Sequence, residues 1–160
     1  MRWDAFERAC PEISTLARTR FVDDEFVLVG SVRSDGSPRI SPNETDFAAD
    51  RLFVSMMWRS MKALDLLRDP RIVVHSVTKN RMGTDGDVKL YGRVVDERDP
   101  DVRAAFRDAI RARINWAPDE PNFHCFSVDI ASAGFIRFGD DPVAMAWDAD
   151  RGLRRLPFPG

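Results

Sequence analysis

Two short turns divide the early part of the chain into three β-strand patterns, and this constrains the fold more than any other feature. The expected strands span residues 26–32, 38–44 and 51–57. The first turn, Ser34-Asp35-Gly36-Ser37, contains a glycine that can adopt a positive φ, and the second turn is Ala49-Asp50. Because connections this short join antiparallel neighbours, the sequence predicts a fold that begins with an antiparallel sheet.

The rest of the chain continues this pattern, with few helices among many short strands. Helical spacing occupies residues 3–18, where Pro11 interrupts it, and a short helix is expected over residues 61–68. Asp99 followed by Pro100 marks the start of a helix that ends near residue 114. Further strands are expected at residues 72–77, 87–95, 123–130, 134–138, 143–147 and 153–156. Since no regular βαβ alternation occurs, we expect a mostly β fold of the α+β class, arranged as a barrel or sandwich.

The bulk composition excludes several classes of protein. A chain of 160 residues with 44% hydrophobic residues suits one domain with its own core. A net charge of −2 gives no general attraction to nucleic acid, and no apolar run approaches the roughly 18 residues of a membrane span. The first residues lack the order of a secretory signal, and Cys10 and Cys125 suit free thiols. We therefore expect a cytoplasmic protein that binds neither nucleic acid nor membrane.

Residues 55–70 contain a candidate phosphate site, where a strand pattern is followed by a helix pattern. A helix N-terminus carries unpaired N–H groups and a partial positive charge, and Ser60 can cap it. Arg59 and Lys62 add full charges, and Trp58 adds a flat apolar surface. This combination predicts a phosphorylated cofactor that carries a ring. From this segment alone the simpler interpretation, a cap beside two solvated cations, is favoured over a phosphate site.

Four segments of the chain, one of which overlaps the candidate phosphate site, resemble segments of a known family in the same order along the sequence. They are residues 29–42, 52–55, 60–74 and 88–94. Together they resemble the pyridoxamine 5'-phosphate oxidase-like, flavin-binding split barrels, with a weaker match over residues 123–138. The resemblance implies a six-stranded antiparallel split β-barrel with a few short flanking helices, as a single flavin-binding domain over residues 1–160. Its parts would be an N-terminal helical segment (1–20), the barrel core and cofactor site (26–95), a helix (99–114) and C-terminal strands (123–156).

The resemblance also implies a cofactor and a partner. Members of this family are typically homodimers that bind flavin mononucleotide (FMN) at the interface, with residues from both chains. The residues implied at the cofactor here are Arg39, Ile40, Ser41, Pro42, Ser55, Met56, Trp58, Arg59, Ser60, Met61, Lys62 and Asp87.

Each of these residues would have a distinct role. The phosphate would be held by Arg39 and by Ser60 with Lys62 at the helix start. The backbone of residues 40–42 would pass the edge of the ring, and Ser55 with Met56 would face the ribityl chain. Trp58 is equally suited to the ring, the core or a dimer interface. Asp87 lies where relatives place a polar residue near the flavin, although turn chemistry with Gly86 also explains it. Many relatives have a second arginine where this chain has Met61, and Arg59 is its possible substitute.

Two departures from the family argue against oxidation of pyridoxamine 5'-phosphate. Glu44 occupies the position of the oxidase's lysine for the substrate phosphate, and a carboxylate there repels a dianion. The oxidase's C-terminal arginine-and-histidine motif has no counterpart, because Asp140-Asp141-Pro142 lies in the comparable region. We therefore expect an FMN-binding oxidoreductase that acts on another small molecule, without assigned catalytic side chains.

Two alternatives remain open at this stage. A deazaflavin coenzyme has the same phosphate, ribityl chain and tricycle, and its acidic tail would need further cations such as Arg33, Arg59 or Arg81. A non-catalytic flavin or haem carrier is the other alternative, because a haem-binding branch of the fold exists. His75 is expected as a hydrogen-bonded core or interface residue. His124 adjoins Cys125 without further ligands nearby, so no metal site is expected.

Overall fold

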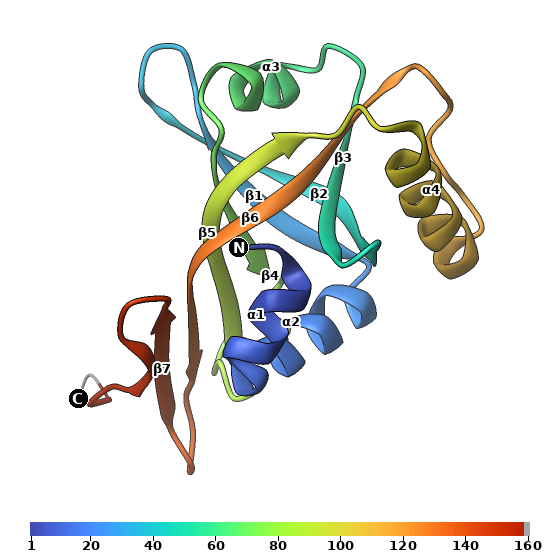
Figure 1. The fold of residues 1–160 in the computed structure, drawn as a ribbon. Helices are drawn as coiled ribbons and strands as arrows, with labels where there is room; N and C mark the ends of the chain where they lie inside the picture. The colour runs from blue at the N-terminus through green and yellow to red at the C-terminus, as the bar shows by residue number, and fades with distance from the viewer. Residues whose placement is uncertain (159–160) are drawn as a thin grey trace.

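Six strands of one antiparallel sheet close into a barrel, around which four helices are arranged (Figure 1). The structure, a computed structural model, describes residues 1–158. The strands are β1 (Phe26–Val32), β2 (Pro38–Ala48), β3 (Arg51–Met57), β4 (Arg71–Ser76), β5 (Asp87–Asp96), β6 (Phe123–Arg137), β7 (Val143–Asp148) and β8 (Gly152–Arg155). The helices are α1 (Trp3–Ala9), α2 (Pro11–Asp23), α3 (Met61–Arg68) and α4 (Pro100–Ile114).

The order of the strands confirms the expected six-stranded barrel. The strands run β3-β2-β1-β4-β5-β6, and pairing of β3 with β6 closes the circle. β7 and β8 extend the sheet beyond β6 as a hairpin, which lies away from the barrel at the lower left of Figure 1. Every pairing is antiparallel, as the short turns predict, and Gly36 takes a φ of +84° in the first of them.

Alternating residues of the strands fill the barrel. Val27 and Val29 of β1 point inward with Val74 of β4 and Leu90 of β5. The apolar residues of α1 and α2, among them Phe6, pack against this core. Figure 1 places these two helices at one end of the barrel and α3 at the other.

β3 is buried on both faces because it lies between the barrel and a helix. Val54 and Met56 belong to the barrel core, whereas Phe53 packs against Phe106 of α4, with ring centroids 5.2 Å apart. Five consecutive residues of β3 are therefore buried, which explains why its sequence is apolar at four of these five positions rather than strictly alternating.

β2 is longer than the strand expected at residues 38–44, since it continues to Ala48. The additional part carries polar residues that are buried and satisfied. The hydroxyl of Thr45 donates to the carbonyl of Phe53 at 2.6 Å, and the carboxylate of Asp46 accepts from Arg113 at 2.8 Å. Both residues are polar, and the partner of Asp46 lies 67 residues away in the chain, so hydrophobic patterning misses the end of the strand.

The two strands expected at residues 123–130 and 134–138 form one strand, β6, so the expected interruption is wrong. Ile130 pairs with Gly92 and Ser132 pairs with Tyr91, which leaves Ala131 as an extra residue in a β-bulge. The bulge reverses the alternation without ending the strand. A Cβ on Gly92 would lie 2.1 Å from the carbonyl oxygen of Asp129, so the close approach there requires glycine.

Candidate cofactor site

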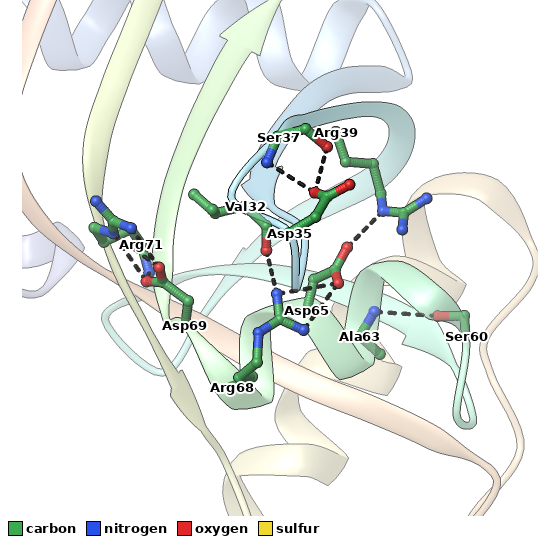
Figure 2. Close-up of polar contacts among 10 residues, drawn as sticks. All are labelled: Val32, Asp35, Ser37, Arg39, Ser60, Ala63, Asp65, Arg68, Asp69 and Arg71. Carbon is green, nitrogen blue, oxygen red and sulfur yellow. Dashed lines mark hydrogen bonds and ion pairs between the residues drawn. The ribbon is translucent and has the colours of Figure 1, made fainter.

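A tight turn leads from β3 into α3 and fixes the start of that helix. Ser60 caps the helix, because its hydroxyl accepts the N–H of Ala63 at 3.4 Å (Figure 2). The N–H of Ser60 in turn donates to the carbonyl of Met57 at 3.0 Å. Arg59 occupies the left-handed region with a φ of +55°, which is unusual for a residue other than glycine. The predicted cap is therefore confirmed, and the turn before it is held in one conformation.

Lys62, in the first turn of α3, bridges to β2. Its Nζ donates to Oδ1 of Asn43 at 2.7 Å and to the carbonyl of Pro42 at 3.1 Å. Burial lowers the pKa of Lys62 below its usual value, and nearby Glu44 partly opposes this shift. Since an ammonium group has three N–H donors, one remains for an anion.

Arg39 contacts the same helix through a buried carboxylate. Its Nε donates to Oδ2 of Asp65 at 2.6 Å, and Arg68 also reaches Asp65, at 3.2 Å (Figure 2). The side chain of Asp65 is 3% exposed and that of Arg39 is 21% exposed. The terminal nitrogens of Arg39 make no hydrogen bond to another described residue. This arginine is therefore fixed by one edge of its guanidinium, and the other edge is available to an anion.

α3 lies along the part of β2 that contains the first predicted residues. Arg39, Ser41 and Asn43 alternate along the strand, and the helix contacts the first and last of them through Asp65 and Lys62. Ser41 therefore lies between two residues that contact the helix. Ile40 points the other way, with 74% of its surface exposed.

A cavity of about 510 Å³ opens beside Lys62. Its walls come from β2, β3, α3, the loop before β6 and the first residues of β1 and β6, and they are mostly apolar. The lining residues are Phe26, Pro42, Glu44, Ser55, Met56, Met57, Lys62, Trp116, Pro118, Asp119, Asn122 and Phe123. Four of the residues predicted at the cofactor thus lie together at this cavity, namely Pro42, Ser55, Met56 and Lys62. Glu44 and Asp119 are its carboxylates, and neither forms an ion pair within residues 1–158.

Trp58 and Met61 do not line this cavity. Trp58 is 56% exposed and stacks on His124, with ring centroids 4.6 Å apart and planes 9° apart. Met61 is 62% exposed at the first position of α3. The backbone N–H of Arg59 donates to Nε2 of His124 at 3.2 Å. A direct contact of Trp58, Arg59 or Met61 with a cofactor therefore stays a prediction.

Asp87 lies at the start of β5 among other charged side chains rather than at the cavity. Its carboxylate forms an ion pair with Lys89 and lies 3.6 Å from Nε2 of His75. These contacts satisfy Asp87 within its own chain, and its predicted role beside the flavin stays a prediction.

Sequence reasoning missed several residues at this site. Asn43 and Asp65 are polar positions whose partners lie 19 and 26 residues away in the chain. The only available signal for Asp65 was a charged residue among the buried positions of α3. Trp116 and Asp119 reach the cavity because the loop before β6 folds back over β3, which no local pattern encodes.

The described residues contain no group of three His, Cys, Asp or Glu side chains that could hold a metal ion. Among the same residues, none of the helices is long and apolar enough to cross a membrane. Cys10 and Cys125 are both buried free thiols, and burial raises the pKa of Cys125 to about 12.

Comparisons with known proteins add information on the fold. No model of a known protein family matches the chain, and a search of curated proteins finds no match either. Solved structures do match. A pyridoxamine 5'-phosphate oxidase-related, FMN-binding protein from Nostoc punctiforme superposes with a TM-score of 0.64 and 17% identity, over 98% of this chain and 95% of that one. A NimC/NimA family protein from Clostridium acetobutylicum gives a TM-score of 0.69 and 13% identity, over 89% and 97% of the two chains.

A haem-binding protein from Mycobacterium smegmatis also matches, with a TM-score of 0.62 and 14% identity over 81% of this chain. This chain spans 56% of that protein's length. Identities this low establish the fold alone. The structural matches confirm the fold that the sequence resemblance implied. The chain has the split-barrel fold of the pyridoxamine 5'-phosphate oxidase-related proteins.

Proposed function

We propose that this protein binds FMN, with the phosphate at the start of α3, and that it is an oxidoreductase for a small molecule. The observation that carries the proposal is Lys62, which lies at a capped helix start and lines an apolar cavity. A helix N-terminus and a cation are together a favourable phosphate site. The Nostoc protein of the same fold, described as FMN-binding, supports this choice of ligand.

The residues present fit such a ligand. Lys62 has one N–H donor left after its contacts to Asn43 and Pro42, and Arg39 has one edge of its guanidinium left after its contact to Asp65. Apolar walls that include Met56 suit a flat ring or a ribityl chain. Bound flavin supplies hydride transfer, and the protein supplies position and electrostatics.

The charges of the cavity argue for a substrate without phosphate. Once a cofactor phosphate neutralises Lys62, Glu44 and Asp119 remain as unpaired carboxylates. A dianionic substrate would meet two like charges in a partly enclosed space. We therefore propose that pyridoxamine 5'-phosphate is not the substrate, and that a neutral or cationic small molecule is.

A second copy of the chain would complete the site. The strand pairing places one outward-facing residue on each of four neighbouring strands in a single row. These residues are Ile40, Gly30, Val73 and Tyr91. Ile40 is 74% exposed and Tyr91 is 45% exposed. An exposed apolar row on a sheet favours association, so we propose a homodimer through this face, with an interface above about 2,000 Å² in total.

Mass spectrometry of the small molecule released on denaturation tests the cofactor directly. We expect FMN from the purified protein, and less FMN from a Lys62→Ala variant prepared in parallel. Release of a deazaflavin coenzyme would agree with a phosphate site at the start of α3 but would replace FMN as the cofactor. Release of haem, with a strong violet absorption band, would overturn the proposal in favour of a haem carrier. A yellow protein that is bleached by a reductant and restored by air would support redox activity.

A further inference from the structure

His124 makes an unusual contact with the turn that begins α3. Its Nε2 accepts the backbone N–H of Arg59 at 3.2 Å, across 65 positions of the chain. Arg59 is the residue at positive φ, in a conformation that is unfavourable for a side chain other than glycine. A hydrogen bond to its N–H therefore acts on the strained residue of the turn.

The imidazole is fixed in place by aromatic rings on both sides. Trp58 stacks on His124 at 4.6 Å between centroids, and Phe126 stacks on it at 5.8 Å, with planes 9° and 6° apart. His124 is 7% exposed. Because Nε2 is the acceptor, the neutral ring carries its proton on Nδ1. The ring is thus held in one orientation, with its acceptor toward the turn.

Several charged groups surround this imidazole. Asp96 at the end of β5 favours the protonated form, whereas Arg103 of α4 disfavours it, and burial is the largest influence. Arg98 and Glu120 line the same hollow, where Arg98 pairs with Asp96 at 3.0 Å and Glu120 pairs with Arg103 at 2.8 Å. These groups form two internal pairs, so their net effect on His124 is small beside its burial.

We propose that His124 is a positioning residue for the cofactor site: its neutral imidazole holds the turn at Arg59, and protonation releases that turn. An imidazolium has N–H groups on both nitrogens and cannot accept from Arg59. Stacking on Trp58 is compatible with either form of the ring, since a cation over an indole is attracted to it. Protonation therefore acts at the turn rather than at the stack. The effect on cofactor affinity rests on the proposed function, whereas the effect on the turn does not.

The direction of the pH dependence follows from the burial. Burial lowers the pKa of His124 below its ordinary value of 6.5. The unfolded chain therefore binds this proton first, and the stability that neutral His124 provides is complete above pH 6.5 and lost as the pH falls below it. The turn, and with it phosphate binding at α3, should weaken on acidification.

Two variants of His124 and one of His75 test the proposal. His124→Gln keeps an acceptor and does not titrate, and His124→Phe keeps a flat ring without an acceptor. His75→Gln removes the only other histidine of the chain and serves as the control. In ligand-free protein, NMR should show the Arg59 amide shifting with the same midpoint as His124, in wild type and in His75→Gln. No such midpoint should occur in His124→Gln. An Arg59 amide that ignores the titration of His124 would overturn the proposal.

Titrations with FMN between pH 5 and pH 8 provide the second readout. FMN itself changes charge near pH 6, so the comparison must be made between variants at each pH. At pH 8, His124→Phe should bind about three- to tenfold more weakly than wild type, the range expected for one hydrogen bond. As the pH falls through the pKa of His124, taken from its NMR titration, wild type should approach the level of His124→Phe, while His124→Gln stays tighter by that factor. Identical pH profiles in all four proteins would overturn the role in binding. A responsive Arg59 amide without FMN binding in any protein would support the positioning role and overturn the proposed cofactor.

Discussion

The Nζ of Lys62 on α3 lies 2.7 Å from Oδ1 of Asn43 on β2. This contact joins the helix to the barrel and holds the ammonium group at the edge of the cavity. Asn43 is 1% exposed, so the acceptor is itself fixed. A preorganised cation loses less side-chain freedom when it binds an anion than a free surface lysine does.

Asn43→Asp should therefore weaken FMN binding. A carboxylate at this position would pair with Lys62 and oppose the phosphate, so we expect at least a tenfold loss of affinity, by analogy with other charge-assisted contacts. Asn122→Asp is the matched control, because it adds the same charge to another wall of the cavity. Fluorescence titration measures the FMN affinity of both variants. Equal losses of affinity would contradict a specific role of the contact between Lys62 and Asn43 in FMN binding.

Asp65→Asn should destabilise the fold. The carboxylate is buried between Arg39 and Arg68, so its loss leaves two guanidinium groups close together. Since both arginines are partly exposed, we expect about 1–3 kcal/mol, below the range for fully buried pairs. Denaturant unfolding measures this loss.

The control for that experiment is Asp69→Asn. Asp69 pairs with Arg71 at 2.5 Å, on the surface of the protein. We expect a smaller shift of the unfolding midpoint than for Asp65→Asn, because this pair lies at the surface and is screened by solvent. A destabilisation by Asp69→Asn as large as that by Asp65→Asn would contradict the structural importance of the buried pair.

Ile40→Glu should produce a monomer that binds FMN poorly. A carboxylate at the Ile40 end of the exposed apolar row would have to be desolvated in the proposed interface. Met82→Glu, in the loop between β4 and β5, places the same charge on a residue with similar exposure, 63% against 74%. Sedimentation at micromolar concentration should give a dimer for Met82→Glu and for wild type. A wild-type monomer fully loaded with cofactor would refute the proposed homodimer.

Pyridoxamine 5'-phosphate should not be oxidised efficiently, because the carboxylate of Glu44 lines the cavity and repels a dianion. Repulsion of a dianion and loss of a cationic contact together cost several kcal/mol, or several orders of magnitude in catalytic efficiency. The assay supplies excess FMN, oxygen and substrate and follows pyridoxal 5'-phosphate. Turnover like that of a genuine oxidase would show that the substrate site lies elsewhere.

The sequence predicted the elements of this fold better than its polar contacts. The first hairpin and the cap at Ser60 depend on local chemistry, and both are confirmed. The contacts of Asn43 and Asp65 depend on where α3 lies against β2, which is set by closure of the whole barrel. No periodicity carries that information.

His124 illustrates the same limit for a single residue. In the sequence it stands beside Cys125 without metal-like spacing. Its partners, Arg59 and Trp58, become neighbours only because β3 pairs with β6, where Met56 lies opposite His124. The bulge at Ala131 was hidden for a related reason, since an extra residue in one strand is defined only by its partner strand.

A comparison of FMN with riboflavin tests the central claim most directly, because the two ligands differ only in the phosphate. We predict that wild type binds FMN at least tenfold more tightly than riboflavin, and that Lys62→Ala removes most of this difference while Lys89→Ala, on β5, keeps it. Equal binding of both ligands by wild type, or an unchanged preference in Lys62→Ala, would contradict a phosphate site at the start of α3.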